Sequence, residues 1–414
     1  MRFFYLILLF LISGGIFADF EYRVLARNEE NFAIKTNAIN QDNFLGFKSG
    51  LTGNAKMLFE AKFKLENLKL KFSDLVLVPL EDGSLTTNSI LEANISFSIY
   101  DFYFDLGKKR ISKGKGFMVS PSDFLYNYLP DYNKGRENSL QFKNGFFLVG
   151  GGYYSDFGNF SFYYIPEISI DNDDVKRLIT EGQKEIYAGF YSIGFDTFDF
   201  GIICIYKEVF NFGAYGSLRI SDNFVFYLDV GLTGKESNYI LEKENYPYVG
   251  DIYNLKEKEL KNTLQALVGL NVIMDNFGLM IEYFYNDRGL TIEEINIFKD
   301  EAKKIANDYN KNNPVSLLNL GNVANFVAKN SFPSFSRHYG MMRLYSIGIK
   351  NWEASSLCIL SLSDLSGKLN NSVEYNLENI NIGGSFFFSF GDDYSEFKLY
   401  GDVWGVSLYV EVCF

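Results

Sequence analysis

Few residues of this chain have the types and spacing of a catalytic or metal-binding site. The 414 residues include one histidine, His338, and its neighbour Ser336 completes no recognisable nucleophile and base motif for hydrolysis. The three cysteines, Cys204, Cys358 and Cys413, lie in strand-like runs without a CxxC pair. This spacing favours packing residues over a disulfide framework or a thiolate metal site. We therefore expect no enzyme, no metal and no cofactor.

The remaining chemistry in the sequence is electrostatic. The chain is acidic, with a net charge of -12, which argues against nucleic acid as a partner. Positive charge nevertheless gathers between residues 108 and 143, beside two aspartates. The cluster contains Lys108, Lys109, Arg110, Lys113, Lys115, Lys134, Arg136 and Lys143, with Asp123 and Asp131. Charges in a narrow passage select ions because the low-dielectric wall concentrates their field. The cluster predicts a preference for anions; the alternative is an exposed loop with solvated lysines.

The start of the chain predicts export. Arg2 precedes an apolar run from Phe3 to Ile12, and small residues lead to Ala18. This pattern is typical of a secretory signal peptide over residues 1–18, cleaved after Ala18. A signal anchor is the alternative, but the apolar run is shorter than the ~20 residues of a helical bilayer span. No Pro- or Ser-rich linker follows, so we expect residues 19–414 to form one domain.

The elements that must position these charges are strands. Segments of about ten residues alternate apolar and polar side chains throughout the rest of the chain, as in NAKMLFEAKFKL at 54–65 and FGLMIEYFYN at 277–286. Alternation with a period of two indicates strands with two unlike faces. A water-soluble β-sandwich also alternates in this way, so the pattern alone does not decide what surrounds the sheet.

The lengths of the connections between strands indicate whether water or lipid surrounds the sheet. Short polar turns, such as those at 66–67 and 275–276, alternate with long segments; one connection near Lys207 and Glu208 is short where a long one is expected. The long segments are 29–52, 78–89, 112–141, 167–184, 235–261 and 287–336. This asymmetry is typical of an all-β, transmembrane, antiparallel up-and-down β-barrel with short periplasmic turns and long outer loops. We count about 18 strands; 16 is the alternative because residues 372–402 can be divided in two ways. The last strand must pair with the first, because lipid offers an open edge no hydrogen bonds.

The longest loop contains a predicted helix. Thr291 and Glu294 have capping-box spacing, and apolar residues follow at helical intervals from Ile292 to Ile305. A helix with one apolar stripe must cover something. It could lie over the outer mouth, enter the lumen as a partial plug, or pack on neighbouring loops and bind a partner.

The C-terminal strand has apolar residues at every second position. These are Trp404, Val406, Leu408, Val410, Val412 and Phe414. With the signal peptide and the alternating strands, this ending resembles the outer-membrane β-barrel porins of diderm bacteria. It looks like the β-signal that the barrel assembly machinery recognises. Residues 106–124 are also similar to a glycine-rich stretch of some larger porin-like barrels, although Lys113 stands where that stretch has tryptophan. The matching positions are Gly107, Lys108, Ile111, Gly114, Gly116, Pro121 and Asp123.

The resemblance implies a location and a function. Residues 112–141 join the fifth and sixth strands, where general porins carry the loop that narrows the pore. The expected constriction residues are Lys109, Arg110, Lys113, Lys115, Asp123, Asp131, Lys134 and Arg136. The implied protein is a porin of the bacterial outer membrane for small hydrophilic solutes, in contact with lipid and the assembly machinery, and a homo-oligomer if it follows other porins. Alternatives are a surface-exposed adhesin or structural barrel with a plugged lumen, and a soluble periplasmic or secreted β-protein.

Overall fold

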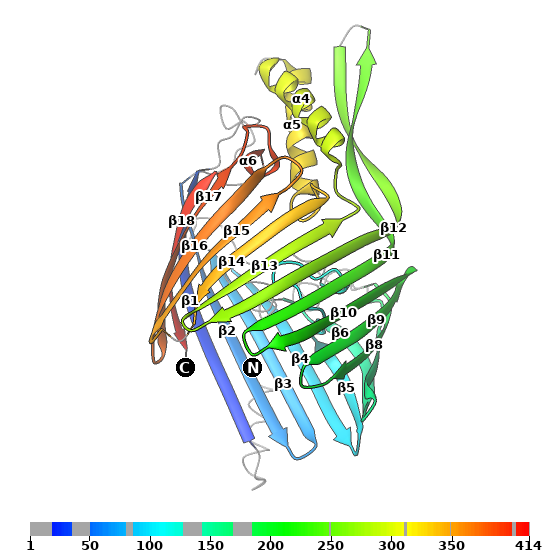
Figure 1. Ribbon diagram of the computed structural model, residues 1–414, viewed down its shortest axis with the longest axis vertical. Coiled ribbons are helices and arrows are strands. Elements are labelled where there is room, and N and C mark those ends of the chain that lie inside the picture. Colours follow the sequence, from blue (N-terminus) through cyan, green and yellow to red (C-terminus); the bar gives the residue numbers. More distant parts are fainter. Residues whose placement is uncertain are drawn as a thin grey trace.

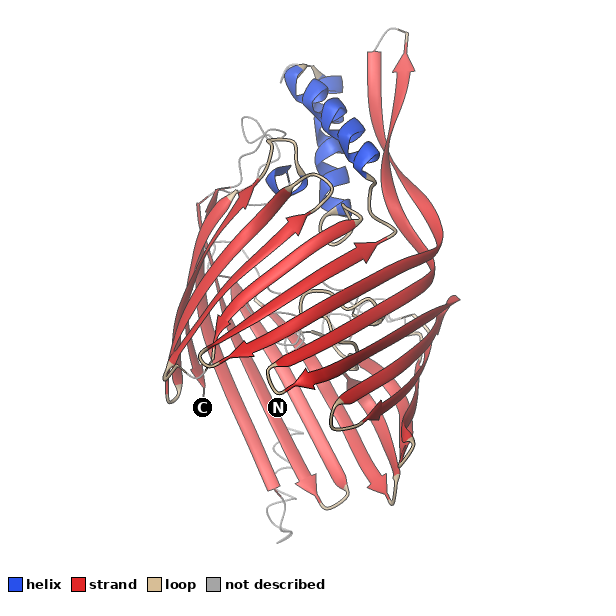
Figure 2. Ribbon diagram, in the orientation of Figure 1, coloured by secondary structure: helices blue, strands red, loops and turns tan. Residues whose placement is uncertain are grey.

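The computed structural model describes residues 19–34, 50–79, 86–126, 143–168, 184–247, 250–309, 313–347, 349–399 and 403–413. These residues form one closed antiparallel barrel of eighteen strands, with helices at one end (Figures 1 and 2). The first nine strands are β1 (Asp19–Ile34), β2 (Gly50–Leu65), β3 (Leu68–Pro79), β4 (Thr87–Ile99), β5 (Phe102–Lys109), β6 (Phe146–Ser155), β7 (Gly158–Ile165), β8 (Ile186–Gly194) and β9 (Phe198–Lys207). The others are β10 (Val209–Ser221), β11 (Phe224–Tyr246), β12 (Gly250–Met274), β13 (Phe277–Asn286), β14 (His338–Ser346), β15 (Trp352–Ser361), β16 (Ser366–Leu377), β17 (Ile380–Phe390) and β18 (Trp404–Cys413).

The barrel closes between its first and last strands. Each strand pairs with its sequence neighbours, and β1 pairs with both β2 and β18, in a register that sets Leu25 opposite Cys413 and Ile34 opposite Trp404. Closure removes the free sheet edges, whose backbone groups would find no partner in lipid. The predicted closure and the count of 18 are confirmed, and the alternative count of 16 is wrong.

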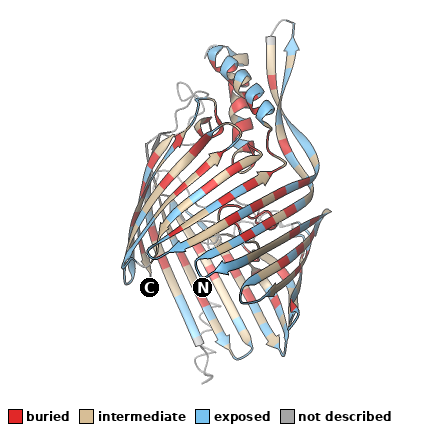
Figure 3. Cartoon of the chain, in the orientation of Figure 1, coloured by how far each residue is buried: buried red, intermediate tan, exposed pale blue. Residues whose placement is uncertain are grey.

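The alternating pattern becomes an outer and an inner face. In β18, Val406, Leu408 and Val410 are exposed on the outside, whereas Ser407 and Tyr409 are buried on the luminal side. The same alternation of exposed and buried residues recurs on strands around the barrel (Figure 3). The two unlike faces predicted from the alternation are therefore present in the last strand. Phe414 lies outside the described residues.

The two rims differ as predicted. Short turns connect the strands at the lower rim in Figure 1, including those at 66–67, 222–223 and 378–379. The end of β18 lies at this rim, because the Cys413 N–H donates to the carbonyl oxygen of Asn379 (2.9 Å). At the other rim, Glu208 alone separates β9 from β10, so this connection is short, as the sequence indicated, although the alternating rule would place a long one there.

The prediction of a loop at residues 235–261 is wrong. Residues 235–261 continue β11 and β12 as a long hairpin beyond the rest of the rim (Figure 1). Charged residues of both signs occur on both strands, and ion pairs such as Lys235 with Glu259 (3.0 Å) and Lys243 with Asp251 (2.8 Å) cross the hairpin. The polar composition suggested a loop, but the pairing of β11 with β12 continues beyond the neighbouring strands. The predicted loops at 29–52 and 78–89 are also shorter, because β1 to β4 extend into both ranges.

Two helices pack against this hairpin. The predicted helix is α4 (Ile292–Asn307), and its capping box is present: Thr291 Oγ1 accepts from the Glu294 N–H (3.2 Å), and Glu294 Oε2 accepts from the Thr291 N–H (2.8 Å). The second helix, α5 (Pro314–Asn330), was not predicted. Phe298 of α4 and Phe326 of α5 share an apolar core with Tyr253 of β12. Of the three alternatives, α4 thus packs on neighbouring loop elements. Among the described residues, no helix is long and apolar enough to cross a bilayer.

Helix α5 also protects the hairpin edges. The Asn330 side chain accepts from the Tyr239 N–H (3.2 Å) and donates to the Tyr239 carbonyl oxygen (2.9 Å) on β11. Asn319 accepts from the Tyr253 N–H (2.9 Å) and donates to the Asp251 carbonyl oxygen (2.8 Å) on β12. Free strand edges invite unwanted pairing, so these contacts stabilise an extended hairpin outside the barrel. The hairpin, α4 and α5 together form the outer module.

Candidate functional site: a passage narrowed by an internal loop

The segment after β5 folds into the barrel. From Arg110 to Tyr126 the chain leaves the wall, and we call residues 110–126 the internal loop. Ile111 packs in an apolar cluster with luminal residues of β6 to β9, including Leu148 and Ile203. Met118 and Val119 are buried against the opposite wall, in a cluster that includes Leu267. The described part of the predicted loop 112–141 therefore bends inward, as expected, and part of the lumen is filled by apolar packing.

Two luminal carboxylates hold the internal loop. On β11, Asp229 accepts from the N–H groups of Lys115 (2.9 Å) and Ser122 (2.8 Å) and from the Ser120 hydroxyl (2.5 Å). On β13, Glu282 Oε1 accepts from the Phe117 N–H and from the Tyr227 hydroxyl, both at 2.7 Å. Hydrogen bonds to charged acceptors are stronger than neutral ones. The loop is thus attached to the far side of the lumen.

Two glycines on the wall let the loop approach closely. A Cβ atom on Gly231 of β11 would stand 2.0 Å from the carbonyl oxygen of Pro121, and one on Gly213 of β10 would stand 2.6 Å from Cβ of Ser122. Glycine inside a strand often marks a close approach of another backbone segment. These strand glycines were a sequence signal for the loop position.

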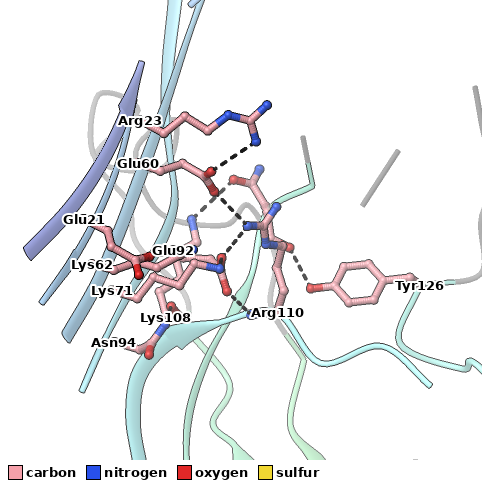
Figure 4. Close-up of polar contacts among 11 residues, drawn as sticks. Glu21, Arg23, Glu60, Lys62, Lys71, Glu92, Asn94, Lys108, Arg110 and Tyr126 are labelled. Atoms are coloured by element: carbon pink, nitrogen blue, oxygen red, sulfur yellow. Dashed lines mark hydrogen bonds and ion pairs between the residues drawn. The ribbon is translucent and has the colours of Figure 1, made fainter. Parts of the chain in front are cut away.

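The structure places two predicted constriction residues together at the loop's start. Arg110 forms an ion pair with Glu92 and lies 3.9 Å from Glu60, while Lys109 lies 2.7 Å from Asp105. Figure 4 shows Arg110 between Glu92 and Glu60. The Arg110 N–H also donates to Glu92 (3.1 Å), so this arginine is fixed by both its backbone and its side chain.

The other described constriction residues lie along the loop. Lys115 forms an ion pair with Asp199 (2.9 Å), and Asp123 accepts from the Ser112 hydroxyl (2.7 Å). The ammonium of Lys113 lies 5.8 Å from the ring centroid of Phe190, and burial lowers the pKa of Lys113, with Lys109 acting in the same direction. The five described constriction residues therefore have different partners along the loop. Asp131, Lys134 and Arg136 lie outside the described residues.

Sequence reasoning missed a larger basic surface on the inner face of β2 and β3. Lys62 stands opposite Lys71, and Lys64 stands opposite Lys69. These four lysines, Lys109 and Arg110 line a cavity of about 440 Å³, together with the carboxylates of Glu21 and Glu92. The alternating lysines of NAKMLFEAKFKL were visible in the sequence. Their cross-strand pairing with the next strand was not, because it depends on register.

The histidine, serine and cysteines considered for catalysis or metal binding do not form such a site in the described residues. The Tyr283 hydroxyl shares a hydrogen bond with Nδ1 of His338 (2.7 Å), and the ring centroids of Tyr285 and His338 are 5.4 Å apart. The Ser336 hydroxyl donates to the backbone carbonyl of His338 (3.4 Å), not to its imidazole ring. Within the described ranges, the three cysteines are free and no group of His, Cys, Asp or Glu could hold a metal ion.

Solved structures share this architecture. No protein-family model and no curated protein matches the sequence. The crystal structure of Acinetobacter baumannii OccAB4 aligns with a TM-score of 0.56 at 8% identity, over 96% of this chain and 98% of that chain. The crystal structure of Acinetobacter baumannii OccAB3 aligns with a TM-score of 0.55 at 9% identity, over 96% of this chain and 99% of that chain. The crystal structure of Pseudomonas aeruginosa OccK5 (OpdH) aligns with a TM-score of 0.53 at 11% identity, over 95% of this chain and 98% of that chain. This chain therefore has the closed barrel fold of outer-membrane porins and Occ channels.

Proposed function

We propose that the protein is a passive diffusion channel of the bacterial outer membrane for small hydrophilic solutes, with a preference for anions. The observation that carries the proposal is the basic luminal surface beside the internal loop. Six cationic and two acidic side chains line its cavity. A surplus of positive charge within a low-dielectric wall attracts anions and repels cations.

The pairing of these lysines supports anion binding. Lys64 and Lys69 face each other across β2 and β3, both side chains are exposed, and neither lies within 4 Å of a carboxylate in the described part of the chain. Like charges directly opposite each other destabilise a sheet. A passing anion would offset that repulsion, whereas Arg110 and Lys71 are already paired with Glu92.

The route to the membrane is part of the proposal. Export would use the signal peptide of residues 1–18 with cleavage after Ala18, and assembly would use the apolar positions from Trp404 to Phe414 as the recognition signal. The outward apolar face of β18 suits this role, since Val406, Leu408 and Val410 are exposed there. Self-association of the barrel stays a prediction.

Two charge-reversal variants test the anion preference. The first replaces Lys113, Lys115 and Arg136 with Glu; the second, chosen from the luminal surface, is Lys64→Glu with Lys69→Glu. Reversal potentials in planar bilayers under a potassium chloride gradient should shift toward cation preference, more strongly for the second variant, because Lys115 is already paired with Asp199. An unchanged anion-to-cation permeability ratio in both variants would refute the preference.

A second candidate function is favoured by the outer module. Helices α4 and α5 share a core with the long hairpin above the rim, and apolar packing fills part of the lumen below. In an adhesin or structural barrel, the outer module would bind a partner and the apolar packing would close the lumen. Single-channel recording separates the candidates: a pore gives conductance steps, and a plugged barrel stays silent.

A further inference from the structure

Arg343 differs in its partners from two other luminal arginines, Arg27 and Arg110. Arg343 of β14 is half-buried, and its guanidinium carbon lies 4.5 Å from the ring centroid of Phe117 and 4.9 Å from that of Tyr345. Arg27 and Arg110 both pair with glutamates. Within the described ranges, no carboxylate lies within 4 Å of Arg343. Its charge is therefore held by aromatic rings and is not neutralised by an ion pair.

The rings that hold Arg343 are themselves fixed. The N–H of Phe117, on the internal loop, donates to Glu282 Oε1, which is also bound by the Tyr227 hydroxyl. The hydroxyl of Tyr345 donates to Asn271 (2.9 Å) on β12. Glu282 is 2% exposed and therefore does not itself present a charge to solutes. Its geometry sets the position of the Phe117 backbone, and the Phe117 ring in turn lies against the guanidinium.

We infer that Arg343 is a further specificity-determining residue for anions in this channel, beside the basic surface of β2 and β3, and that Glu282 is a positioning residue acting on it through Phe117. The inference rests on the proposed function. A guanidinium against aromatic faces keeps its full charge and some of its N–H groups for a ligand. Passing anions would meet this charge where the internal loop meets β14.

Substitutions of Arg343 test the first part. Arg343→Gln should lower the chloride-to-potassium permeability ratio by roughly three- to tenfold, as expected from losing one partly screened unit charge in the passage. Arg343→Lys should retain most of the ratio. The matched control is Lys350→Gln, which removes the same charge at a lower-rim turn and should leave the ratio unchanged. An unchanged ratio in Arg343→Gln would overturn the assignment.

A double-mutant cycle tests the second part. Glu282→Met removes the acceptor for the Phe117 N–H and should lower the ratio, whereas Glu282→Gln keeps an acceptor oxygen and should preserve it. Because Glu282 acts through Arg343, Glu282→Met should add little to Arg343→Gln. Additive effects would refute the positioning role. Phe117→Leu, which keeps the backbone contact and removes the ring, should lower the ratio even if Glu282→Met fails to fold.

The results also separate this inference from the proposed function. Wild-type protein that is silent, or that conducts without anion preference, would refute the proposed function. Anion preference in the wild type that survives Arg343→Gln would refute only the role of Arg343. Heat-modifiable migration in gels should show in each case that the variant barrel is folded.

Discussion

Replacing Asp229 should release the internal loop. Asp229→Leu removes three hydrogen bonds, donated by the N–H groups of Lys115 and Ser122 and by the Ser120 hydroxyl. Bonds to a charged acceptor contribute about 1.5–3 kcal/mol each, or about 5–9 kcal/mol together. Part of this is recovered because the variant no longer buries a charge, which itself costs several kcal/mol. We expect a net weakening of about 3 kcal/mol, or roughly 100-fold in the population of the detached loop.

Hydrogen exchange measures this detachment directly. In refolded protein, peptides covering residues 113–123 should exchange slowly in the wild type and roughly 100-fold faster in Asp229→Leu. Strand peptides of β14 to β17 should be unchanged. Single-channel conductance should rise as the loop leaves the passage. The matched control is Glu374→Gln, which changes a luminal carboxylate on β16 that accepts from the Tyr409 hydroxyl.

The reasoning fails if residues 113–123 exchange at the same rate in Asp229→Leu and the wild type. That result would mean that apolar packing of Met118 and Val119 holds the loop without the carboxylate. Faster exchange throughout the barrel in Asp229→Leu would instead show general destabilisation. If Glu374→Gln showed the same faster exchange, loss of any luminal carboxylate would have this effect, and the change would not be specific to the internal loop.

Further predictions concern other parts of the chain. Gly231→Ala should raise single-channel conductance, because its Cβ atom would stand 2.0 Å from the Pro121 carbonyl oxygen and push the loop away; wild-type conductance would contradict this. Phe326→Ala should destabilise the outer module by about 3–5 kcal/mol and speed proteolysis within 287–337 without changing conductance; unchanged proteolysis would count against a shared core. Deleting Phe414 should impair outer-membrane assembly, measured by membrane fractionation, and normal insertion would argue against its role as a signal.

The barrel could be predicted because lipid and backbone chemistry leave few choices. Alternation with a period of two and short turns on one side indicate about 18 strands and the closing pair, and the structure decides between 18 and 16. The hairpin at 235–261 was misjudged because its charged residues resemble a loop. Beyond the rim, ion pairs such as Lys243 with Asp251 and the edge contacts of Asn319 and Asn330 stabilise a strand pair of that composition.

The site was only partly predictable. The basic residues near the fifth strand were visible as a cluster, but Arg110 and Lys115 contact different walls, which no local pattern reveals. Opposed lysines such as Lys64 and Lys69 depend on register between strands. Arg343 lies more than 200 residues after the internal loop in sequence, and its contact with Phe117 exists only because the loop crosses the lumen.

Single-channel recording of the purified, refolded wild-type protein would show whether the barrel contains an open passage. We predict discrete conductance steps as single barrels insert into a planar bilayer. Consistent silence from barrels that are shown to be folded and inserted would contradict the account and favour a plugged barrel that acts through its outer module.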